Sequence, residues 1–113
     1  MKKSNIFAFI ELSKLVTALT NQNAAVQTSC KDQLMRNSSY FNFIESKYFS
    51  DDLRPEWDQI LATVSAMGPK RDEDGFMVMN RFNHTIHELA DQDCEKLVDR
   101  LVLLQQRVKE QFE

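Results

Sequence analysis

Residues 51–69 read DDLRPEWDQILATVSAMGP, and they contain both ends of a helix as well as its apolar face. Pro55 suits the first helical position, where its missing N–H costs no hydrogen bond. Glu56 follows in the same turn, where the helix dipole favours negative charge. Gly68 supplies the left-handed residue that commonly ends a helix, and Pro69 blocks continuation. The apolar face of this expected helix comprises Trp57, Ile60, Leu61, Val64 and Met67.

The residues before this segment also show helical periodicity, with apolar side chains every three to four positions. We expect helices over residues 4–20 and 22–36, the second weaker because it is rich in Asn, Gln, Ser and Thr. Asn37-Ser38-Ser39 then forms a break or a new helix cap. Residues 38–49 predict another helix, with Tyr40, Phe41, Ile44 and Tyr48 on its core-facing stripe.

After Gly68 the sequence predicts a loop and then more helix. Residues 68–75 are polar and bounded by the two glycines, as is typical of a loop. Helical spacing resumes over residues 76–90 and 94–112. Asp91-Gln92-Asp93 favours a break between these segments, but no Gly or Pro requires one. A single helix through residues 76–112 is therefore the alternative.

Composition agrees with an all-helical fold. The chain has 113 residues and contains only two glycines and two prolines. Tight turns and strand corners use these residues, so their scarcity argues against a β-sandwich or barrel. We predict an all-α fold, a compact bundle of five or six helices that forms a single domain over residues 1–113.

Charge and cysteine content restrict the classes of function. The chain contains fourteen Lys and Arg residues and seventeen Asp and Glu residues, which gives a formal net charge of −3. The cations occur singly or in pairs, which disfavours binding to a nucleic-acid backbone. The apolar run Ile6–Ile10 is too short for a signal peptide or a membrane span, so we expect a cytoplasmic protein. Cys30 and Cys94, without CxxC spacing, then indicate reduced thiols.

Four polar side chains on the expected helix after residue 76 raise the question of a metal site. His84, His87, Glu88 and Asp91 share one helix face and include metal-ligating residue types. The order is not HExxH, and the face lies opposite Phe82, Ile86 and Leu89. An exposed face of one helix lacks the supporting shell of a functional metal centre. We therefore assign no metal and no cofactor, and the sequence leaves open whether these four residues ever bind one.

Arg81 and His87 are separated by five residues, NRFNHTIH in context. This spacing resembles the R-x4-6-H motif of HEPN-type ribonucleases, which are all-helical and often dimeric. The resemblance covers only these two residues, and Phe82 follows the arginine where that family usually has a polar residue. It implies, as an alternative function, a helical ribonuclease or nucleic-acid-associated regulator using Arg81 and His87. No G-x-S-x-G, P-loop or G-x-G-x-x-G motif supports another enzyme class.

Several apolar residues lie off the main stripe of their expected helices and are candidates for a partner-binding surface. They are Phe7, Ile10, Phe43, Phe49 and Leu103, with Ile6 beside the first two. Such a surface predicts a small non-enzymatic protein that binds another protein, as adaptors, secretion chaperones, immunity proteins and inhibitors do. The partner would be a second protein, for which a basic protein or a second copy of the chain are the candidates.

Overall fold

Six α-helices make up most of the chain in the computed structural model, which describes residues 3–20 and 29–111. The elements, in order, are α1 (Lys3–Thr20), α2 (Cys30–Arg36), α3 (Ser39–Phe43), the 3-10 helix η1 (Ser46–Tyr48), α4 (Arg54–Val64), β1 (Lys70–Arg71), β2 (Met77–Met79), α5 (Arg81–Glu88) and α6 (Asp91–Glu110). The predicted all-α bundle of five or six helices is confirmed, with one short β-hairpin added to it.

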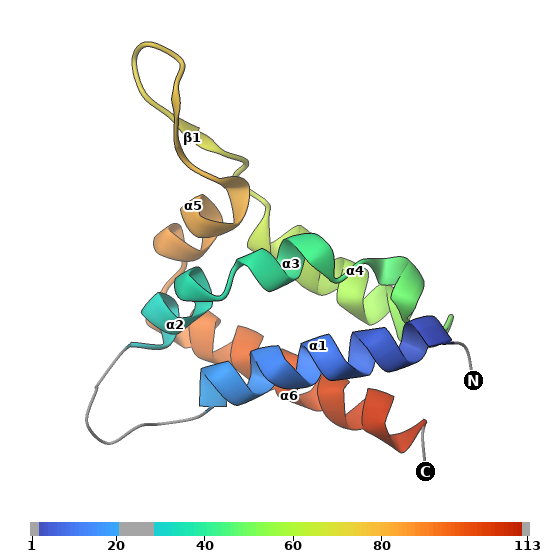
Figure 1. Cartoon of the computed structure of the whole chain (residues 1–113). Coiled ribbons are helices and arrows are strands. Elements are labelled where there is room, and N and C mark those ends of the chain that lie inside the picture. Colours follow the sequence, from blue (N-terminus) through green and yellow to red (C-terminus); the bar gives the residue numbers. More distant parts are fainter. Residues whose placement is uncertain (1–2, 21–28, 112–113) are drawn as a thin grey trace.

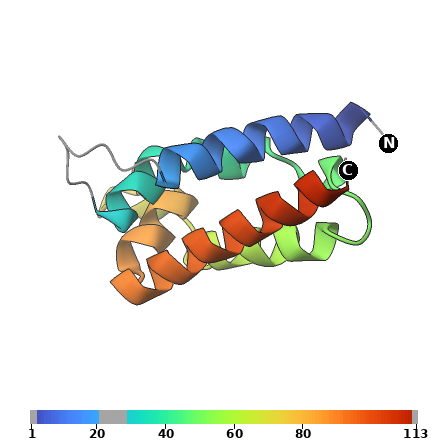
Figure 2. The ribbon, with the colours of Figure 1, turned by 90° about the horizontal axis from the view of Figure 1, so that it is seen from below.

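The two longest helices, α1 and α6, lie side by side and form the base of the bundle (Figure 1). The Gln105 amide of α6 donates a hydrogen bond to the Ser13 hydroxyl of α1 over 3.2 Å. Seen from below, α6 crosses between α1 and α4 (Figure 2). The short helices α2 and α5 pack together at one end, and the hairpin leaves the bundle above α5 (Figure 1).

Trp57 of α4 is the centre of the buried core. Its ring stacks near Phe49 and Phe41, with centroid distances of 5.3 and 6.1 Å. Its indole N–H donates a 2.9 Å hydrogen bond to the carbonyl oxygen of Ile44. The indole is fully buried, so this bond satisfies a donor that water cannot reach. Phe82 adds a further ring, 5.9 Å from that of Phe41. Most of the remaining core is aliphatic and includes Leu12, Leu15, Leu34, Ile60, Ile86, Leu97, Leu101 and Leu104.

The expected helix over residues 38–49 is wrong in its second half. α3 ends at Phe43, and Ile44 and Glu45 have extended backbone with ψ near 105° and 148°. Because the chain leaves the helix there, a helical wheel no longer gives the direction of later side chains. Phe49 therefore points inward and is only 3% exposed. This corrects its assignment to a partner-binding surface.

The N-terminal helices agree with the sequence where they are described. α1 covers the expected first helix and buries Ala8, Leu12 and Leu15. Residues 22–28 of the expected second helix lie outside the described residues. The part that follows, α2, begins after Ser29, whose hydroxyl accepts the Asp32 backbone N–H over 3.1 Å.

The segment after the hairpin forms two helices, so the alternative of one helix through residues 76–112 is wrong. α5 ends at Glu88, and Leu89 and Ala90 are both extended, with ψ of 146° and 154°. α6 then begins at Asp91, with Asp91 and Asp93 in its first turn. Negative charge there is stabilised by the helix dipole, which explains why a break forms without Gly or Pro.

Cys30 and Cys94 are both free thiols. Burial raises the pKa of each thiol, because the charged thiolate loses its hydration. For Cys94 the neighbouring Lys31 opposes this effect on the pKa but does not reverse it. Neither thiol has the lowered pKa that marks a nucleophilic cysteine. In the described part of the chain, no helix combines the length and apolarity needed to span a bilayer.

Replacing Trp57 by Phe tests the role of the indole in the core. Trp57→Phe leaves the Ile44 carbonyl without its donor and loses part of the ring stack, so we expect the free energy of unfolding to fall by about 2–3 kcal/mol. Urea unfolding followed by circular dichroism measures it. Phe76→Leu, at an exposed position, is the control and should change stability by less than about 0.5 kcal/mol. Equal stability of the two variants would contradict this role.

The raised thiol pKa values predict slow modification in the folded state. At pH 8 we expect Cys94, which is fully buried, to react with DTNB at least about tenfold more slowly than in denaturant. Cys30, which is partly exposed, should react faster than Cys94. The single variants Cys30→Ala and Cys94→Ala separate the two rates. Reaction of native Cys94 at the denatured rate would show that the start of α6 opens freely.

Candidate functional site

Residues 69–80 form an arm that projects from the helical bundle (Figure 1). Its strands pair antiparallel, Lys70 opposite Met79 and Arg71 opposite Met77, with an irregularity between the two pairs. This corrects two expectations: residues 68–75 are not a plain loop, and the helix expected from residue 76 begins only at Arg81. Aromatic, β-branched and Met residues over 76–79 fit a strand as well as a helix, and the turn before them decides the outcome.

The tip of the arm is closed by Asp72 and Gly75. The Asp72 carboxylate accepts the backbone N–H groups of Asp74 and Phe76 over 3.0 and 2.9 Å. Gly75 has a φ of 85°, a left-handed conformation that costs a residue with a Cβ more than it costs glycine. The Arg71 guanidinium donates to the Gly75 carbonyl oxygen over 3.1 Å. The reversal is therefore fixed by local contacts and needs none from the bundle.

The base of the arm is fixed to α5 by two hydrogen bonds. The backbone N–H of Met67 donates to the Thr85 hydroxyl over 3.1 Å. The His84 ring nitrogen Nδ1 lies 3.0 Å from the Gly68 carbonyl oxygen. His84 therefore has a structural role where the sequence offered it as a metal ligand. Because α4 already ends at Val64, Met67 does not extend the apolar face of α4 as expected and is exposed.

Three consecutive apolar side chains of the arm face solvent. Phe76 is 72% exposed, and Met77 and Val78 are each 59% exposed. A folded chain rarely leaves contiguous large apolar groups in water unless they bind something. The sequence reasoning missed these residues because it placed them on a helix. The signal was present in Asp72–Gly75 followed by strand-forming residues, the pattern of a hairpin with a short Gly-containing loop.

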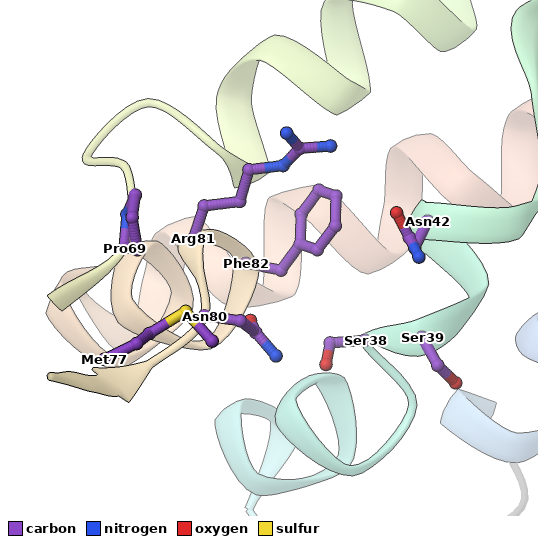
Figure 3. Close-up of a pocket in the computed structure, with 8 residues that line it drawn as sticks. All are labelled: Ser38, Ser39, Asn42, Pro69, Met77, Asn80, Arg81 and Phe82. Carbon is purple, nitrogen blue, oxygen red and sulfur yellow. The ribbon is translucent and has the colours of Figure 1, made fainter.

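A pocket of about 410 Å³ lies between the base of the arm, α3 and the start of α5 (Figure 3). Its lining residues are Ser38, Ser39, Asn42, Pro69, Met77, Asn80, Arg81 and Phe82. The Arg81 guanidinium and the Asn42 amide lie beside the Phe82 ring, the Ser38 hydroxyl points toward Asn80, and the Ser39 hydroxyl points away from the pocket (Figure 3). The guanidinium carbon lies 4.7 Å from the centre of that ring, a cation–π contact.

Three of the five sequence-predicted surface residues are exposed on α1 and α3. Phe7, Ile10 and Phe43 are exposed, and α3 and η1 pack beside α1. The Phe7 ring contacts Tyr48 of η1 at a centroid distance of 4.8 Å, and Phe43 contacts Tyr40 at 5.0 Å. We refer to these rings and Ile10, the apolar side chains exposed or half-exposed on α1, α3 and η1, together as the α1 face.

Leu103 does not belong to the α1 face. It is 61% exposed on the side of α6 away from the core, where its neighbours one turn away are Asp99, Arg100 and Arg107. A single apolar side chain among charged groups is ordinary surface. The structure therefore separates Leu103 from the other candidates.

The charges at the edge of the α1 face are paired within their own segments. The Glu45 carboxylate lies 3.2 Å from the Lys47 ammonium, which lowers the pKa of Glu45. Tyr48 donates to the same carboxylate, which raises the pKa of the tyrosine. Asp51 pairs with Arg54 over 3.2 Å, and Glu11 pairs with Lys14 over 3.3 Å. Each of these pairs joins residues of one segment, so these three carboxylates already have a cation beside them.

Arg81 and His87, the pair that resembles the HEPN motif, have different surroundings. Arg81 lines the pocket at the first residue of α5. His87 is not among the lining residues; it is exposed near the other end of α5, with its ring 3.4 Å from the Glu88 carboxylate. Within residues 3–20 and 29–111, no three His, Cys, Asp or Glu side chains gather closely enough to hold a metal ion.

Comparison of the chain with protein-family models, with curated proteins and with solved structures finds no match.

Removing the Asp72 carboxylate tests whether the arm is an independent local unit. Asp72→Ala removes the acceptor of the Asp74 and Phe76 backbone N–H groups, so amide exchange of Phe76 should speed up by about tenfold or more after correction for intrinsic rates. Asp74→Ala is the matched control, because no hydrogen bond or ion pair is formed by the Asp74 side chain in the described part of the chain. The free energy of unfolding of the bundle, measured in urea, should change by less than about 0.5 kcal/mol in both variants. A larger loss in Asp72→Ala would show that the arm is coupled to the core.

Proposed function

We propose that this chain is a small, non-enzymatic, cytoplasmic protein-binding module whose main contact element is the arm. The observation that supports the proposal most strongly is the run of exposed apolar side chains at Phe76, Met77 and Val78. An isolated two-stranded hairpin is marginally stable in water and gains stability when a partner covers it. The arm exposes the kind of side chains that anchor protein interfaces.

The two strands of the hairpin differ in charge, and the uncharged strand β2 is the better one for pairing with a strand of a partner. β1 follows Pro69 and carries Lys70 and Arg71, which are features that protect an exposed strand edge from further pairing. β2 carries Met77, Val78 and Met79, with no charge, and in the described residues its only strand neighbour is β1. We infer that a partner adds an extended strand beside β2, so that backbone hydrogen bonds supplement the apolar contacts.

The α1 face is a second surface that the same partner, or another copy of the chain, would use. Phe7, Ile10 and Phe43 carry this part of the proposal, whereas Phe49 is buried and Leu103 is isolated. The two free thiols are compatible with a reducing compartment. The ribonuclease alternative receives no comparable support, because His87 lies outside the pocket that contains Arg81.

A capture experiment with matched variants tests the proposal. The tagged chain retains partners from an extract of the organism that encodes it, and the double variant Phe76→Ser with Val78→Ser should lose them. Leu103→Ser, which also removes an exposed apolar side chain, is the control and should retain them. Loss of an interface anchor costs about 2 kcal/mol or more, or at least about tenfold in affinity.

Two further measurements complete the test. Ile10→Ser reports whether the α1 face contributes to the same partner. Light scattering after size-exclusion chromatography of the wild type and the arm variant shows whether the partner is a second copy of the chain. Retention of identical proteins by the wild type and the arm variant would contradict a role for the arm.

A further inference from the structure

The pocket at the base of the arm carries an inference that does not depend on the identity of any protein partner. Its volume, about 410 Å³, lies within the range of sites that hold small molecules, about 300–1,000 Å³. Phe82, Met77 and Pro69 provide apolar wall, and Ser38, Asn42, Asn80 and Arg81 provide polar groups (Figure 3). A mainly apolar wall with a few polar groups is the usual composition of a ligand pocket.

The free hydrogen-bonding capacity of the pocket consists largely of donors. The Asn80 side-chain oxygen accepts the Asn83 backbone N–H over 2.8 Å as the cap of α5, so its remaining group is the NH₂ donor. Arg81 offers guanidinium N–H donors, and in the described residues no carboxylate lies within 4 Å of it. Asn42 adds an amide that makes no hydrogen bond within the described part of the chain. A ligand with several hydrogen-bond acceptors would therefore match these groups.

Ser38 is the second, independent observation. The residue is only 6% exposed, it lines the pocket, and its side chain forms no cap bond to α3. No other hydrogen bond involves its hydroxyl in residues 3–20 and 29–111. A hydroxyl without a protein partner is free to donate to, and accept from, a molecule that enters the pocket. In Figure 3 the hydroxyl points into the space beside Asn80, where a ligand atom would reach it.

The charge of the pocket is opposite to that of the chain. The chain has a net charge of −3, whereas the lining residues include one arginine and neither Asp nor Glu. We propose that the pocket binds a small organic anion, with its carboxylate or phosphate group on Arg81, Ser38 and the Asn42 and Asn80 amides. The apolar part of the ligand lies against Met77 and Pro69. Arg81 suits this role because its planar donors match the oxygens of either anion.

Nuclear magnetic resonance titration of the ¹⁵N-labelled protein with benzoate, phenyl phosphate and neutral benzamide tests the proposal. Benzoate or phenyl phosphate should shift the amide signals of residues 38–42 and 77–82 in a saturable way, whereas benzamide should not. The anion that binds more tightly identifies the preferred acid group. Absence of saturable shifts with both anions up to about 10 mM would overturn the proposal, as would equal binding of benzamide.

Variants of exposed residues separate the pocket from general charge effects. Arg81→Gln should weaken anion binding at least about tenfold, because it removes a charge-assisted contact. Asn42→Asp, which places a negative charge at the pocket without touching the core, should weaken it similarly. Arg107→Gln removes the same charge from the exposed side of α6 and should leave binding unchanged. Equal losses in Arg107→Gln and Arg81→Gln would show that the anion responds only to net charge. Arm variants leave Arg81 in place, so failure of partner capture and failure of anion binding are distinguishable.

Discussion

The hydrogen bond from the Trp57 indole to the Ile44 carbonyl is the constraint on which the rest of the fold depends. Within a continued helix that carbonyl would accept a backbone N–H one turn later; here it accepts the indole instead. The chain therefore leaves the helical path at Ile44, and Phe49 turns back beneath the indole ring. This one contact links α4 to the segment between α3 and η1. It also directs the two flanking aromatic residues into the core.

The sequence predicted the features that local chemistry determines. Pro55 lies in the first turn of α4, and Asp91 and Asp93 lie in the first turn of α6, as expected for residues that favour helix starts. Gly68 was expected to end the helix that begins near Pro55, but α4 already ends at Val64, with Ser65 as its C-cap. Phe49 could not be placed, because its direction depends on a bond between residues 44 and 57 that no periodicity encodes. The pocket could not be predicted from the sequence either, because the packing of α2 against α5 brings Ser38 and Arg81 together.

The arm shows how one short turn can override a periodic pattern. Val78 and Met79 have the spacing of a helix face with Phe82, and that spacing alone suggested a longer α5. The Asp72 carboxylate and the left-handed Gly75 instead reverse the chain before Phe76, so the following residues pair with β1. The helix starts only where Asn80 caps it. Local turn chemistry and not apolar spacing therefore decides which side chains reach solvent.

The positions of the two glycines affect how the sequence of this chain can evolve. Both glycines have positive φ, Gly68 before the arm and Gly75 at its tip, and a Cβ at either would meet no atom within 4 Å. No backbone reversal inside the bundle uses a glycine. Insertions, deletions and substitutions in the arm, between Pro69 and Asn80, can therefore occur without repacking the core around Trp57. Selection can alter what the arm recognises while the helical scaffold that presents it stays the same.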